Sequence, residues 1–111
     1  MKIIKAKRII DGTGTKILLG HAVLVEGGCI QAIIPWDEIK FDAEILDLGD
    51  MTLLPGFIDT HLHITLDPGN PNGYYDPEQN PYEIILRAVS NAQSALRAGI
   101  TTIGDCGARN E

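Results

Sequence analysis

The chain has 111 residues, of which 44% are hydrophobic and 22% are charged, and its formal net charge is −6. This composition is typical of one globular domain and argues against a disordered chain or a coiled coil. The acidic balance, with no clustered basic patch, argues against a nucleic-acid partner.

Other whole-sequence features point to a cytoplasmic protein. The two cysteines make no disulfide framework. No run of apolar residues reaches the ~18 that a membrane span needs. A signal peptide has an uninterrupted apolar region and a cleavage site with small residues. The N-terminal stretch "MKIIKAKRIIDGTG" has neither. We therefore predict a cytoplasmic location and no membrane partner.

Residues 1–53 predict the first part of a small β-sandwich domain. "GHAVLVEGG" and "CIQAIIP" read as two strands joined at Gly27-Gly28, which predicts a β-hairpin over residues 22–34. "DGTGT" reads as a turn, and "AEILDLGDMTLLP" predicts two more short strands. Short strands separated by frequent turns are typical of a sandwich or a small barrel.

The character of the sequence changes at Pro55-Gly56. "GFIDTHLHI" has the composition of a strand. Residues 65–81 then hold prolines at positions 68, 71, 77 and 81, which excludes both helix and strand. A loop of this length in a compact domain is usually functional or disordered. Tyr74 and Tyr75 lie in this loop. We expect them either to line a substrate pocket or only to pack the loop against the domain.

A helix is predicted after this loop, with Asn80 as its N-cap, Pro81 in its first turn and Gly99 at its end. Its predicted apolar stripe is Ile84, Ile85, Ala88, Val89, Ala92, Ala95 and Leu96, and its predicted outward-facing residues are Ser90, Asn91, Gln93, Ser94 and Arg97. "ITTIGDCG", residues 100–107, predicts a further strand. The order strand, helix, strand predicts a βαβ unit with a parallel pair of strands.

The stretch "LLPGFIDTHLH", residues 53–63, carries three polar side chains in what should be a buried strand. Because side chains alternate with period two, Asp59, His61 and His63 share one face. Two histidines so spaced are able to bind one Zn-like ion at about 2.0–2.1 Å. Asp59 would then support the ligands by hydrogen bonding or fix the preceding turn. The alternative is a His-x-His pair on a solvent-facing strand.

The position of these residues favours a site. They lie at the carboxyl end of a predicted parallel strand and a long loop follows, which is where sites form in parallel sheets. Asp105 ends the second predicted strand and would face the same edge. We expect it to play a supporting or structural part there and not to be a ligand.

These segments also carry a resemblance to a known family. "LLPGFIDTHLH" resembles the Pro-Gly-x-Ile-Asp-x-His-x-His signature of the metal-dependent amidohydrolase superfamily. "RIIDGTGT", "AVLVEGGCIQAI" and "LRAGITTIGDCG" resemble other segments of that family in the same order and spacing. The resemblance covers nearly the whole chain, and the pattern is most similar to the branch that contains imidazolonepropionase and Xaa-Pro dipeptidase-like enzymes.

The resemblance implies an α/β fold: a β-sandwich segment over 1–53, then the first strand, helix and second strand of an incomplete (β/α)8 TIM-type barrel over 54–111. It implies one or two divalent metal ions, with zinc expected, and His61 and His63 as metal ligands. The implied reaction is hydrolysis of the C–N bond of a small-molecule substrate, an amide, a cyclic amide or a dipeptide, through a metal-activated water.

The family's bridging lysine, its two further histidine ligands and its catalytic aspartate have no counterpart here, since no lysine follows Lys40 and the third histidine is His21. A complete barrel takes about 250 residues. We therefore expect an N-terminal fragment, inactive alone, whose open sheet edges are covered by the remainder of the polypeptide or by self-association. The alternatives are a fragment of a mononuclear metal deaminase, or a non-enzymatic module that completes its sheet with a partner chain.

Overall fold

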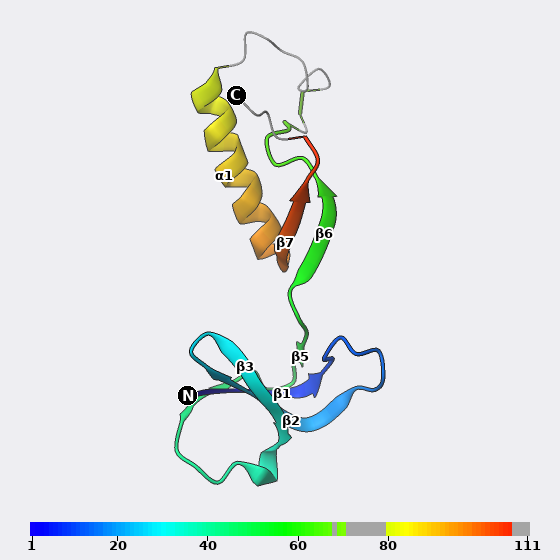
Figure 1. The fold of residues 1–111 in the computed structure, drawn as a ribbon, viewed down its shortest axis with the longest axis vertical. Coiled ribbons are helices and arrows are strands. Elements are labelled where there is room, and N and C mark those ends of the chain that lie inside the picture. Colours follow the sequence, from blue (N-terminus) through cyan, green and yellow to red (C-terminus); the bar gives the residue numbers. More distant parts are fainter. Residues whose placement is uncertain (68, 71–79, 108–111) are drawn as a thin grey trace. The chain divides into compact units, whose positions relative to one another are not determined.

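The computed structural model of the chain describes residues 1–67, 69–70 and 80–107. It divides into two compact units, Met1–Pro55 and Gly56–Glu111. The first unit is built on a sheet of five strands, and the second holds a pair of strands and a helix (Figure 1). Among the described residues, no helix is both long enough and apolar enough to cross a bilayer.

The sheet of the first unit is organised around β1 (Lys2–Ile9). β2 (Leu18–Glu26) pairs antiparallel with β1, and β3 (Cys29–Pro35) pairs antiparallel with β2. The predicted hairpin is confirmed, and its turn residues Gly27 and Gly28 have φ angles of 59° and 79°, which glycine adopts without strain. A short 3-10 helix, η1 (Trp36–Glu38), follows β3.

The two further short strands are also present, as β4 (Glu44–Asp47) and β5 (Thr52–Leu53). Both pair in parallel with β1, one after the other along its length. The sheet buries side chains around a cluster of Ala6, Ile9 and Val23. The described part of this unit forms one sheet, so the second layer of the predicted sandwich stays a prediction.

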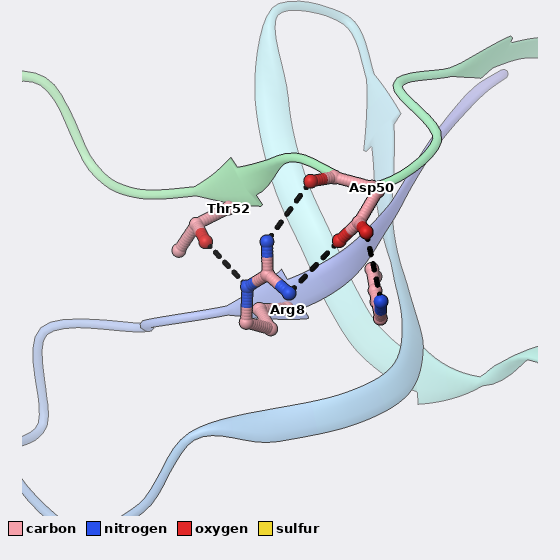
Figure 2. Close-up of polar contacts among 4 residues, drawn as sticks. Arg8, Asp50 and Thr52 are labelled. Carbon is pink, nitrogen blue, oxygen red and sulfur yellow. Dashed lines mark hydrogen bonds and ion pairs between the residues drawn. The ribbon is translucent and has the colours of Figure 1, made fainter.

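Arg8 joins β1 to the segment between β4 and β5 (Figure 2). Its guanidinium group donates to the Thr52 hydroxyl at 2.8 Å and to the Asp50 carbonyl at 2.9 Å, and it pairs with the Asp50 carboxylate at 2.9 Å. Lys7 pairs with the other oxygen of that carboxylate at 2.8 Å. Side chains thus hold this segment against β1 where the strand pairing passes from β4 to β5.

The second unit follows the predicted order of strand, helix and strand. β6 (Phe57–Leu62) and β7 (Ile100–Asp105) pair in parallel, and α1 (Pro81–Arg97) connects them and contacts β7 (Figure 1). The strands approach closely at Gly104, where a Cβ atom would lie 2.8 Å from the carbonyl oxygen of Thr60. Glycine is therefore required there by space.

α1 has the predicted ends. The Asn80 side chain accepts a hydrogen bond from the Tyr82 N–H at 3.0 Å, and Gly99 has a φ of 90°. The predicted apolar stripe, however, is divided. The partly covered side of α1 consists of Ile84, Arg87, Ala88, Asn91 and Ala95, while Ile85, Val89, Ala92 and Leu96 are exposed. The prediction that Asn91 faces outward is wrong, because its amide group bonds to the loop after β6.

Candidate metal centre

The carboxyl end of β6 brings two histidine rings together. His61 is the penultimate residue of β6, and His63 follows its last residue. Their Nε2 atoms are 3.3 Å apart, and their rings meet edge to face with centroids separated by 5.1 Å. His61 is exposed and His63 is half-buried. The predicted alternation of side chains therefore carries both rings to one side, even though the strand itself ends between them.

The separation of the two nitrogens fits one metal ion. Two ligands at about 2.0–2.1 Å from a tetrahedral zinc ion lie about 3.3–3.4 Å from each other. The observed Nε2–Nε2 distance of 3.3 Å agrees with this value. The same distance also suits a long hydrogen bond from one ring N–H to the other ring. The distance is thus compatible with metal binding and with a hydrogen bond between the two imidazoles.

Asp59 lies on β6 two residues before His61, and its carboxylate contacts the backbone of that residue. Its Oδ1 accepts a hydrogen bond from the N–H of His61 at 3.1 Å. The half-buried carboxylate thus fixes the chain at the point where the histidine pair begins. This contact lies within β6, so both parts predicted for Asp59, support of the ligands and fixing of the preceding turn, stay predictions.

Asp105, a further predicted site residue, has a contact within its own segment. Asp105 ends β7, and its Oδ1 accepts the N–H of Gly107 at 3.0 Å, which closes a local turn. Tyr74 and Tyr75 lie outside the described residues. Among the residues that the structure does describe, no group of three or more His, Cys, Asp and Glu side chains is placed to hold a metal ion. The described residues thus bring two imidazole nitrogens together, and their role as metal ligands stays a prediction.

Two residues of α1 contact the loop beside the histidine pair, and the sequence does not predict these contacts. Asn91 of α1 donates to the carbonyls of Ile64 and Leu66, at 2.8 and 3.0 Å. Arg87, one helical turn earlier, donates to the carbonyl of Thr65 at 3.4 Å. Both contact the loop that directly follows His63. The signal in the sequence is their spacing, since positions 84, 87, 88, 91 and 95 form one helical stripe and two of these five residues are polar.

The geometry is accompanied by clear similarity to known proteins. A model of the amidohydrolase family matches residues 52–111, and a model of the NagA composite domain matches residues 12–52. The allantoinase of Streptomyces avermitilis is 35% identical over 93% of the chain and 20% of its own length. The enamidase of Eubacterium barkeri is 33% identical over 90% of the chain and 23% of its own length. The chain thus spans less than a quarter of these relatives.

Similarity also extends to other relatives and to solved structures. The imidazolonepropionase of Chromobacterium violaceum is 42% identical over 42% of the chain and 12% of its own length. A Xaa-Pro dipeptidase crystallised with methionine in its active site superposes with a TM-score of 0.73, at 23% identity over 92% of this chain and 25% of that chain. The aminofutalosine deaminase of Helicobacter pylori superposes with a TM-score of 0.70, at 20% identity over 95% of this chain and 29% of that chain. These superpositions show that the fold is shared.

Proposed function

Because this chain belongs to the amidohydrolase family, we propose that it forms the N-terminal portion of a metal-dependent hydrolase that cleaves a carbon–nitrogen bond. The observation that carries the proposal is the pair of Nε2 atoms, His61 and His63, held 3.3 Å apart at the carboxyl end of β6. We propose these two residues as metal ligands and zinc as the expected ion, with one or two ions in the complete enzyme.

The proposed architecture is a β-sandwich domain that begins with residues 1–53 and a (β/α)8 barrel that begins with residues 54–111. The parallel pairing of β6 and β7 through α1 supports the first repeat of such a barrel. In a barrel, α1 would also pack against neighbouring helices. Its exposed Ile85, Val89 and Leu96 suit that position. The rest of the site would come from the remainder of the polypeptide, so this portion alone should be inactive.

Each described residue of the site has a part in the proposed mechanism. His61 and His63 would bind the ion through Nε2, which requires that both rings are neutral and carry their protons on Nδ1. Asp59 holds the backbone N–H of His61 and so fixes the start of the pair. A zinc ion held by His61 and His63 would supply a nucleophile at neutral pH by lowering the pKa of a water molecule, and would polarise the substrate carbonyl.

The proposed substrate is a small molecule with an amide, cyclic amide or dipeptide bond. Allantoinase, enamidase and imidazolonepropionase are the curated relatives that support this class. A second candidate is a mononuclear deaminase, which the likeness to the fold of aminofutalosine deaminase supports. Tyr74, Tyr75 and Asp105 stay candidates for contact with the substrate or for support of the site.

Calorimetric titration with zinc tests the metal site. We expect heat of binding for the chain, with low affinity because two ligands leave the ion incompletely coordinated. The double variant His61→Ala/His63→Ala should lose this heat. His21→Ala is the matched control, because its imidazole lies in the first unit and bonds the Leu19 carbonyl. Equal heats for all three proteins would remove the metal role of the pair.

A further inference from the structure

The loop that follows β6 has three successive carbonyl groups that α1 binds through side chains. β6 ends at Leu62, so the carbonyls of Ile64, Thr65 and Leu66 lie beyond the strand pairing. Asn91 and Arg87 donate to all three. An unpaired backbone carbonyl in a covered position is unfavourable. These side chains therefore supply the hydrogen bonds that a partner strand would otherwise give.

Asn91 uses both hydrogens of its amide group in this contact. Its Nδ2 atom lies 2.8 Å from the Ile64 oxygen and 3.0 Å from the Leu66 oxygen, and the side chain is partly buried. An asparagine amide has two N–H donors on one nitrogen, so two carbonyls on either side of one residue match it well. Arg87 reinforces the loop through the Thr65 carbonyl and through an ion pair with Asp67 at 3.7 Å.

The same loop is bonded to His63. The N–H of Leu66 donates to the carbonyl of His63 at 3.1 Å, which closes a turn that begins at the histidine. Asn91 therefore holds Leu66, and Leu66 holds His63. The backbone of His61, by contrast, is bonded to Asp59 on the strand itself. The backbones of the two histidines are thus bonded to different segments, that of His61 to β6 and that of His63 to the turn that Asn91 of α1 contacts.

From these contacts we infer that Asn91, reinforced by Arg87, is a positioning residue that sets the distance between the His61 and His63 rings by holding the 63–66 turn against α1. The inference has two parts, and only the second, the effect of Asn91 on metal binding, rests on the proposed function. The positioning itself concerns side chains that are described, and it is measurable without any ion.

The decisive variant is Asn91→Asp, in the longest polypeptide that carries this sequence. The substitution keeps the size of the side chain, removes both donors and turns carboxylate oxygens toward two carbonyl oxygens. Gln93→Glu is the matched control, because it makes the same amide-to-carboxylate change on an exposed position of the same helix. Should the Asn91→Asp protein not fold, Asn91→Ser, which retains one donor, serves in its place.

Two readouts separate the inference from the proposed function. In the metal-free protein, the nuclear Overhauser contact between the His61 and His63 rings should be lost in Asn91→Asp and kept in Gln93→Glu. In a titration with zinc alone, Asn91→Asp should bind about 10-fold more weakly than Gln93→Glu, as for partners that orient metal ligands. An inter-ring contact that Asn91→Asp leaves unchanged would overturn the positioning role.

The combinations of results are also informative. Loss of the ring contact without any change in zinc affinity would overturn the link between this turn and the metal site. A protein that binds no zinc, but loses the ring contact in Asn91→Asp only, would refute the metal proposal and support the positioning role of Asn91.

Discussion

At the scale of single residues, the contacts of Asp50 lower the pKa of its carboxyl group. Its carboxylate is hydrogen-bonded first by Lys7 and then by Arg8, and these contacts hold the pKa of Asp50 below its ordinary value of 3.8. A carboxyl group whose pKa is lower in the folded state stabilises that state above its unfolded pKa. The stabilisation is then lost as the pH falls through the lowered folded pKa.

We therefore predict that Asp50→Asn lowers the thermal midpoint of the chain at pH 6, and that the difference from the unmodified chain closes as the pH falls below 3.8. The reason is that a protonated Asp50 and an asparagine are both uncharged. Melting curves followed by circular dichroism across this range provide the measurement. Asp42→Asn is the control, since among the described residues the exposed Asp42 makes no ion pair. A difference that stays constant with pH would contradict the prediction.

The residues of the candidate site differ in how far the sequence predicts them. Strand periodicity predicts that His61 and His63 share a side, and their 3.3 Å separation agrees with it. The roles of Arg87 and Asn91 are not predictable in the same way. A polar residue on a helix is ordinarily assigned to solvent, and only the fold shows that carbonyls of a distant loop lie opposite these two positions.

At the scale of elements, local signals identify the strands and the helix but not all their partners. The Gly27-Gly28 turn dictates the pairing of β2 with β3, because a tight turn joins neighbours directly. The parallel pairing of β4 and β5 with β1 has no such local cause, since it joins segments about 40 residues apart. The apolar stripe of α1 is likewise divided into covered and exposed residues by contacts with distant segments, which local sequence does not reveal.

The contact of β6 with β7 at Gly104 gives a prediction at this scale. An alanine there would place its Cβ 2.8 Å from the Thr60 carbonyl oxygen, and backbone cannot yield as a flexible side chain does. We expect Gly104→Ala to destabilise the second unit by about 1–3 kcal/mol, as overpacking does elsewhere. It should also shift the amide resonances of Thr60 and His61. Chemical denaturation and NMR spectra of the variant measure the two effects.

Thr102→Ala is the appropriate comparison, because it places an alanine at an exposed position of the same strand. It should leave the resonances of Thr60 and His61 in place. If Gly104→Ala were as stable as Thr102→Ala and had the same spectrum at β6, the close approach of the two strands would not hold in solution.

At the scale of the whole molecule, apolar side chains remain uncovered in both units. β3 and β4 are outer strands of their sheet, and Ile30 and Ile45 on them are 69% and 55% exposed. In the second unit, Ile58 on β6 and Leu86 on α1 are 67% and 70% exposed. Open strand edges combined with apolar surface favour association with other chains. In the complete enzyme that we propose, further strands and helices would cover the same surfaces.

We therefore predict that the 111-residue chain, when produced by itself, self-associates in a concentration-dependent manner. The double variant Ile85→Glu/Val89→Lys should reduce this association, because it removes two exposed apolar side chains from α1 and adds a helix-stabilising pair four residues apart. Since burying such a side chain contributes roughly 1.5 kcal/mol or more, we expect association weaker by about 100-fold. Sedimentation velocity measures the change.

Ser90→Glu/Ser94→Lys provides the control for that experiment, because it adds the same charged pair at exposed polar positions of the same helix. It should leave the association as strong as in the unmodified chain. Equal weakening by both variants would assign the effect to charge and not to the apolar surface of α1. A monomeric chain that unfolds in one cooperative step would contradict the prediction altogether. It would mean that these two units are stable without further covering, as a self-contained module would be.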